Sequence, residues 1–243
     1  MYMKRYSCSL FIACLMTLTT TSSLASVVIQ GTRVIYPESA KEVTVKMVNE
    51  GRSPLLVQSW LDDGNENGDP AKMKLPFIVT PPVSRLDPQK GQSVRITWTG
   101  KALAQDKESI FWFNVLEIPP KDKNAEGKSK LNLALRSRIK FFYRPASLKG
   151  SFIDGLNNVK WSLVNDAGNV AIVLKNDSPY YLSLIGGAVW AGAKKYDYKP
   201  KMLSPFSEER FVVPQLTTTS VNKVSWVALN DYGADAEVVK TVK

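Results

Sequence analysis

In LNLALRSRIKFFYRP, residues 131–145, apolar residues alternate with polar or small ones. Its apolar members are Leu131, Leu133, Leu135, Ile139 and Phe141. A period of two is typical of a half-buried β-strand, because successive side chains point to opposite faces. Arg138, Lys140 and Arg144 lie in the same stretch. The pattern therefore predicts a long strand that enters a core with one face and carries cations that need partners.

Four further strands are predicted before this stretch. Apolar residues alternate from Val43 to Met47 and from Val94 to Trp98, and apolar runs cover 55–61 and 110–118. Polar and proline-bearing turns separate these strands, among them DDGNENGDP at 62–70. No segment shows a long apolar period of 3.6 residues, so the chain reads as strands almost throughout.

After Pro145 the pattern of short strands starts again. Strand-like runs cover 159–164, 170–174, 180–185, 210–213 and 221–229, and turns that include the Gly186-Gly187 pair separate them. About seven short strands per hundred residues, with frequent turns, are typical of an immunoglobulin-like sandwich. The sequence therefore predicts an all-β chain with two immunoglobulin-like β-sandwich domains in tandem, residues 26–145 and 146–243. A single large jelly roll is the alternative architecture, although the restart after Pro145 favours two domains.

The first 25 residues have the features of a secretory signal peptide. Lys4 and Arg5 precede an apolar run at 10–18, and small residues ending at Ala25 follow it. The apolar run is shorter than the roughly 20 residues that a transmembrane helix needs. We therefore expect cleavage after Ala25, export, and no membrane anchor in the processed chain; a retained anchor is the alternative.

The composition excludes several classes of function. The chain has no histidine, and its two cysteines, Cys8 and Cys14, lie in the predicted signal peptide. The exported part therefore lacks the residues for the usual zinc sites and for Ser-His or Cys-His catalysis. No paired-carboxylate or Gly-rich phosphate motif is present, so we expect neither an enzyme nor a cofactor or metal. The net charge of +10 suits anionic partners, but export argues against nucleic acid.

The longest of several short blocks with a shared resemblance is LAQDKESIFWFNVLEIPP, residues 103–120. The others are GTRVIYP at 31–37, TPPVSRLDP at 80–88, RIKFFYRP at 138–145, NDSPYYLSLIG at 176–186, MLSPFSE at 202–208 and NDYG at 230–233. In order and spacing these blocks resemble the PapD-like periplasmic chaperones of the chaperone-usher pathway. The charged segment KDKNAEGKSK at 121–130 is similar to the short-loop subfamily. The resemblance covers essentially the whole exported chain.

The resemblance implies two domains set at an angle, with a cleft that holds a pilus or fimbrial subunit. Such a subunit has an incomplete sandwich, and in this family the last edge strand of the first chaperone domain fills its groove. Leu131, Leu133 and Leu135 match the residues that enter this groove. Arg33 and Lys140 match the two basic residues that hold the C-terminal carboxylate of the subunit. Together they set the register of the added strand.

Another set of residues matches an interdomain ion network that fixes the cleft angle in this family. Its members here are Glu108, Arg144 and Asp231, to which we assign a structural role. Arg136 and Arg138 are expected on the polar face of the long strand or at the rim of the cleft.

The expected function is that of a periplasmic, non-enzymatic assembly chaperone. It would bind, fold and cap pilus or fimbrial subunits by donating a strand, and deliver them to an outer-membrane usher without a cofactor. The exposed edge of the free chaperone could be capped by another copy of the chain. The alternative is an exported fimbrial subunit or adhesin with a β-sandwich fold, which would have one incomplete sandwich and an N-terminal alternating extension.

Overall fold

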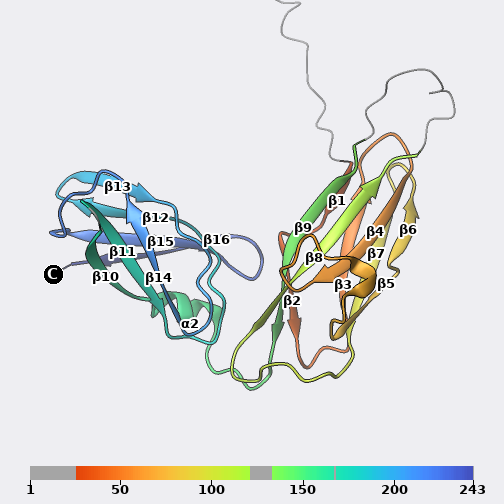
Figure 1. Ribbon diagram of the computed structural model, residues 1–243, viewed down its shortest axis with the longest axis horizontal. Helices are drawn as coiled ribbons and strands as arrows, with labels where there is room; N and C mark the ends of the chain where they lie inside the picture. Colours follow the sequence, from red (N-terminus) through yellow and green to blue (C-terminus); the bar gives the residue numbers. More distant parts are fainter. Residues whose placement is uncertain (1–25, 121–132, 167, 243) are drawn as a thin grey trace, which may run out of the picture.

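The computed structural model describes residues 26–120, 133–166 and 168–242, which form two β-sandwich domains (Figure 1). The predicted all-β fold with two immunoglobulin-like sandwiches is confirmed, and the jelly-roll alternative is wrong. The predicted signal peptide, Leu131 and the segment at 121–130 lie outside the described residues. Within the described ranges, no helix is both long and apolar enough to cross a membrane.

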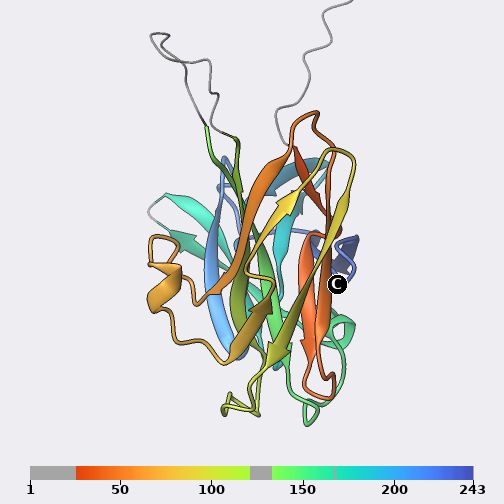
Figure 2. The ribbon, with the colours of Figure 1, turned by 90° about the vertical axis from the view of Figure 1, so that its right-hand side faces the viewer.

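The first domain packs two sheets face to face (Figure 2). One sheet has the order β1 (Val27–Ile29), β3 (Val43–Asn49), β7 (Gly91–Trp98) and β5 (Phe77–Thr80). The other has the order β2 (Arg33–Pro37), β9 (Leu135–Arg144), β8 (Ser109–Ile118), β4 (Leu55–Asp62) and β6 (Val83–Leu86). A short 3-10 helix, η1 (Pro70–Lys72), lies in the loop after β4. The functional site uses the second of these sheets.

Aromatic side chains fill the space between the two sheets. The ring of Phe77 lies 5.0 Å from that of Phe141, 5.2 Å from that of Phe111 and 5.6 Å from that of Tyr36. These contacts are edge-to-face, the arrangement that the aromatic quadrupole favours. Phe141 and Tyr143 of β9 are both fully buried. The odd-numbered side chains of β9 therefore face the core, and the even-numbered ones face the other side of the sheet.

The first strand of the domain is divided between the two sheets. β1 pairs with β3 in an antiparallel manner, whereas β2 pairs with β9 in a parallel manner, starting at the pair Arg33 and Lys140. Gly31 lies between the two segments with φ of 113°, a conformation that residues with a Cβ rarely adopt. Because β2 begins opposite Lys140, no described strand pairs with this edge of β9 at residues 135–139.

The second domain also consists of two sheets and adds one short helix, α2 (Phe152–Asn157). The first sheet has the order β10 (Lys160–Asp166), β11 (Asn169–Asn176) and β14 (Ser207–Val213). The second has the order β13 (Lys194–Tyr198), β12 (Leu184–Ala191), β15 (Lys223–Leu229) and β16 (Asp235–Thr241). Trp226 is fully buried between them and donates its indole N–H to the carbonyl oxygen of Leu156 at 3.2 Å.

One predicted strand of the second domain has the wrong bounds. The sequence places a strand at 180–185, followed by a turn at Gly186-Gly187, whereas β12 begins at Leu184 and continues through both glycines. A Cβ atom at Gly187 would overlap the ring of Tyr198 on the neighbouring strand β13. The glycine is therefore needed for close packing within the sheet and does not mark a turn.

Candidate binding site at the domain junction

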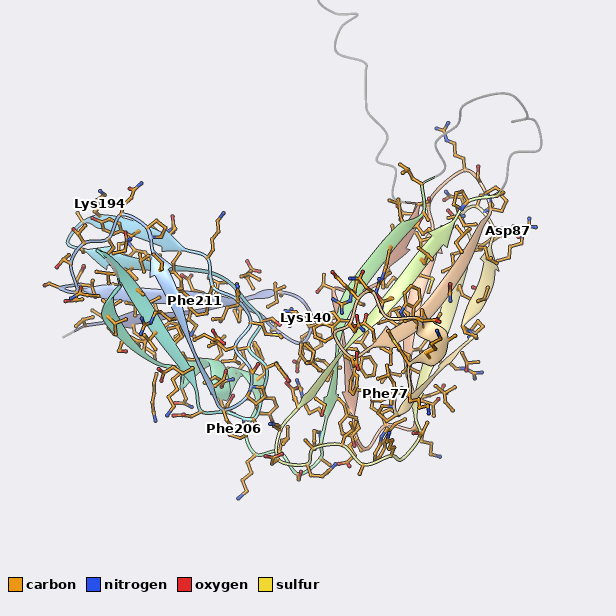
Figure 3. All side chains as sticks on the ribbon, viewed as in Figure 1. Phe77, Asp87, Lys140, Lys194, Phe206 and Phe211 are labelled. Carbon is orange, nitrogen blue, oxygen red and sulfur yellow. The ribbon has the colours of Figure 1, made fainter. Side chains whose placement is uncertain are left out.

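Arg33 and Lys140 lie together where the two domains meet, and Figure 3 labels Lys140 at this junction. They are register partners on β2 and β9, so their side chains leave the same face of the sheet. The Nη1 atom of Arg33 donates to the carbonyl oxygen of Leu229 at 2.9 Å. The Nζ atom of Lys140 donates to the hydroxyl oxygen of Ser183 at 3.0 Å. Both acceptors belong to the second domain, so the pair of cations spans the junction.

The two cations have no carboxylate partner among the described residues. The Nε atom of Arg33 is buried without a hydrogen-bond acceptor. Burial lowers the pKa of Lys140, and the charge of Arg33 lowers it further. Burial also lowers the pKa of Arg33, although Asp231 and Glu108 oppose this effect. A carboxylate can accept several charge-assisted hydrogen bonds, and arginine and lysine supply them in this arrangement. The junction can therefore bind one carboxylate.

The open edge of β9 lies next to exposed leucines. Leu133 is 57% exposed and Leu135 is 38% exposed, although both have the odd parity of the core-facing side chains in β9. They continue the apolar face of the strand beyond the core of its own domain. At about 3.3 Å per residue, Leu135 lies roughly 17 Å along the strand from Lys140. An unpaired strand edge beside apolar side chains is a site at which another strand can pair.

Arg144, at the end of β9, contacts both of the acidic residues that the sequence analysis grouped with it. Its Nε atom donates to Glu108 Oε1 at 2.7 Å, and its two Nη atoms donate to the carboxylate of Asp231 at 2.7 and 2.8 Å. Glu108 belongs to the first domain and Asp231 to the turn after β15 in the second. Burial lowers the pKa of Arg144, but its bonds to Asp231 and Glu108 outweigh this and raise it above the ordinary value.

Glu108 makes further contacts across the junction. It is only 2% exposed, and its Oε2 atom accepts the backbone N–H of Tyr181 in the second domain at 2.8 Å. Its own backbone N–H donates to the carbonyl oxygen of Pro179 at 3.0 Å. The rings of Phe142 and Tyr181 pack 5.7 Å apart beside these bonds. These contacts therefore join the two domains directly beside Arg33 and Lys140.

A polar cluster on the same face of the sheet was not predicted from the sequence. It consists of Asp62, Asn114, Arg136 and Arg138, which we call the Asp62 cluster. The spacing of Arg136 and Arg138 by two indicates that both side chains lie on one face of the strand. Asp62 reaches them only through the order of the strands in the sheet. Within the described ranges, no group of three or more acidic, histidine or cysteine side chains is placed to hold a metal ion.

Comparison with protein families gives two adjoining matches. Residues 26–149 match the family described as "Pili and flagellar-assembly chaperone, PapD N-terminal domain". Residues 154–239 match the family described as "Pili assembly chaperone PapD, C-terminal domain". The first match contains Arg33, Lys140, Arg144 and the open edge of β9, and the second contains Asp231.

Relatives of known name match along most of their length. The chain is 44% identical over 220 residues to the probable fimbrial chaperone YadV of Escherichia coli (strain K12), covering 89% of each protein. It is also 44% identical over 220 residues to the chaperone protein HifB of Haemophilus influenzae, covering 89% of this chain and 88% of HifB. Both relatives therefore contain counterparts of the two domains.

Solved structures show the same two-domain arrangement. The crystal structure of the YadV chaperone has a TM-score of 0.77 and 40% identity, covering 90% of this chain and all of that one. A chain from the structure of the Salmonella enterica SafA pilin in complex with the SafB chaperone has a TM-score of 0.75 and 25% identity. That match covers 91% of this chain and 99% of the other.

Proposed function

The chain belongs to the PapD family of pili-assembly chaperones, and we propose that it binds a pilus or fimbrial subunit along the open edge of β9. It is a chaperone and not an enzyme. The observation that carries the proposal is the edge of β9 at 135–139, with which no described strand pairs and which ends at the neighbouring cations Arg33 and Lys140. The alternative that the chain is itself a fimbrial subunit loses support, because the relatives of this chain are named chaperones.

The subunit supplies a strand that pairs with this edge. Backbone hydrogen bonds then provide affinity, and alternate side chains of β9 provide specificity. Leu135 and Leu133 enter the apolar groove of the subunit, where full burial of each side chain contributes about 1.5 to 3 kcal/mol before ordering costs. Leu131 is the next residue of this alternation, outside the described residues. The SafA pilin in complex with the SafB chaperone supports a pilus subunit as the partner.

Arg33 and Lys140 bind the C-terminal carboxylate of the subunit. This contact fixes the end of the added strand, and therefore the register along β9. A slip of one residue would turn the leucines away from the groove, because the side-chain period of a strand is two. Glu108, Arg144 and Asp231 serve the same purpose indirectly, since they hold the two domains around the anchor.

The chaperone acts in the periplasm after its signal peptide is removed, and it delivers its subunit to an outer-membrane usher. The signal-like residues 1–25 and the naming of the relatives as fimbrial chaperones support this assignment. No cofactor takes part, because the donated strand is exchanged for a strand of the next subunit.

The test begins with the bound partner. A tagged parent chain is purified from periplasm, and the subunit that co-purifies is identified by mass spectrometry. Leu133→Ala should then weaken binding of that subunit about tenfold or more, because the burial of its side chain is lost. The free protein should melt as the parent does, since Leu133 is exposed. Binding is measured by surface plasmon resonance with the identified subunit.

Val212→Ala is the matched control. Val212 is also exposed and apolar, at 47%, but lies on β14 of the second domain, away from β9. The Val212→Ala variant should bind the subunit as the parent does. Equal binding by the Leu133 and Val212 variants would contradict the assignment of β9 as the donated strand.

Capture of the subunit should also change the titration of Lys140. Burial and the charge of Arg33 lower the pKa of this amine in the free chaperone, whereas a bound carboxylate would raise it. The contribution of Lys140 to affinity is therefore complete below its pKa in the free protein, and it is lost as pH rises through its pKa in the complex. NMR titration of labelled lysine in both states measures the two values. An unchanged pKa in the complex would contradict contact with a carboxylate.

A further inference from the structure

Asp62, the last residue of β4, gathers hydrogen-bond donors from two neighbouring strands. Its side chain is fully buried. One carboxylate oxygen accepts Arg138 Nη2 at 2.5 Å and the backbone N–H of Gly64 at 2.7 Å. The other accepts Arg138 Nε at 2.9 Å, Asn114 Nδ2 at 2.7 Å and Arg136 Nη2 at 3.4 Å. Since the sheet order is β9-β8-β4, this single carboxylate ties β9 across β8 to β4.

The cations of the Asp62 cluster are occupied by internal partners. Arg136 donates through Nε and Nη2 to Asn114 Oδ1 at 2.9 and 2.7 Å, and through Nη1 to the carbonyl oxygen of Glu66 in the loop after β4. Its guanidinium stacks 5.0 Å from the ring of Trp60. The guanidinium of Arg138 stacks 4.5 Å from the ring of Trp112. The cluster therefore has the features of an internal brace and not of an open anion site.

The brace acts on the part of β9 that has the least support. Arg136 and Arg138 lie within residues 135–139, where no described strand pairs with the outer edge of β9. A strand held on one edge alone is expected to fray, and a frayed strand must be ordered before it can pair. The even-numbered side chains bind Asp62, which leaves the odd-numbered Leu135 free on the opposite face. One face of the segment is thus held while the other remains available.

We propose that Asp62 is a positioning residue for subunit capture, which keeps residues 135–139 of β9 extended and paired to β8 before a subunit arrives. This inference rests on the proposed strand donation by β9. A segment that is already ordered loses less conformational entropy on binding, so the brace favours association. Once a subunit pairs with the outer edge, β9 is held from both sides. The contacts of Asp62 are then no longer needed to keep residues 135–139 ordered. Asp62 therefore affects the association rate more than the dissociation rate.

The test uses Asp62→Asn in the full-length processed chain. Asparagine keeps the size of the side chain and an oxygen for Gly64, but it removes the charge that binds both arginines. Amide hydrogen exchange of the free protein should rise about tenfold over residues 135–139, relative to the parent, while exchange in β10 and β11 stays unchanged. Association with the subunit identified by co-purification should slow about tenfold, with little change in dissociation.

Asp87→Asn is the matched control. Asp87 is an exposed acid of the same domain that pairs with Arg85 at 2.9 Å, and Figure 3 shows it far from the junction. It should leave exchange and association at the parent values. If Asp62→Asn lowers the stability of the whole domain, the double variant Asp62→Asn/Arg138→Gln removes both charges, so that neither is buried alone.

The outcomes separate this inference from the proposed function. Unchanged exchange at 135–139 in both Asp62 variants would overturn the inference, and so would raised exchange with an unchanged association rate. The proposed function fails on a different result: the Leu133 and Lys140 variants would bind the subunit as well as the parent does. A loss that appears only in the dissociation rate would assign Asp62 to the finished complex and also overturn the positioning role.

Discussion

Replacing either Lys140 or Arg33 by alanine is expected to abolish stable capture of the subunit while the free chaperone stays folded. Truncating one partner of a buried, hydrogen-bonded charge pair commonly costs about 2 to 5 kcal/mol, much of it as an unpaired charge left on the other partner. Here that charge is the carboxylate of the subunit. The measurement is recovery of the co-purified subunit with each variant, together with a thermal melt of the free protein.

The anchor prediction has a control of the same charge. Lys194→Ala removes an exposed lysine at the far end of the second domain, as Figure 3 shows, and should recover the subunit as well as the parent does. Lys140→Met keeps the apolar stem of the side chain and removes only its charge. Full recovery with both Lys140→Ala and Arg33→Ala would contradict the carboxylate anchor. A collapsed melt of Lys140→Met would assign the lysine to stability instead.

Arg144→Ala is expected to lower the free energy of unfolding of the free chaperone by about 3 to 5 kcal/mol. The physical reason is Glu108, which is 2% exposed and would lose its guanidinium partner. Asp231→Ala should have a smaller effect, because the side chain of Asp231 is 33% exposed and Arg144 keeps its contact with Glu108. Urea-induced unfolding followed by circular dichroism measures the difference.

An exposed ion pair serves as the control for this second prediction. Asp177 pairs with Lys160 and Lys175, whose side chains are well exposed, and ion pairs in water contribute little to stability. Asp177→Ala should therefore unfold almost as the parent does. The double variant Arg144→Met/Glu108→Gln should recover much of the lost stability, since no charge remains buried alone. An Arg144→Ala curve that overlays the parent curve would show that the network is solvated and does not stabilise the junction.

The strands with a clear apolar alternation were predictable from the sequence, and those without it were not. β3 and β7 bury alternate side chains, and Ile139, Phe141 and Tyr143 of β9 pack in the same core, so a period of two is visible in the residues. β16 has one buried residue, Val238, and therefore carries little periodic signal. β12 was misplaced because Gly186-Gly187 indicates a turn locally, whereas Gly187 is required by the ring of Tyr198 on the next strand.

The residues of the candidate site could be named from the sequence only through the resemblance of short blocks to a family. Arg33 and Lys140 are far apart along the chain, and nothing in their local sequences indicates that they meet. They meet because β2 lies parallel to β9, a pairing that depends on the change of sheet at Gly31. The same pairing leaves residues 135–139 open. Local patterns cannot predict such a pairing, because the two segments are distant in the chain and neither sequence indicates its partner.

Two β-sandwiches and the amphipathic strand at 131–145 were predictable from the amino-acid sequence, because strand formation and burial leave a period of two in the residues. It also determined the absence of histidine chemistry. The arrangement of the sheets and domains sets which edge of β9 stays open and which domain faces Lys140. It also decided that Asp62 binds Arg136 and Arg138. These contacts join residues distant in the chain, so they depend on sheet order and domain packing, which local residue patterns do not encode.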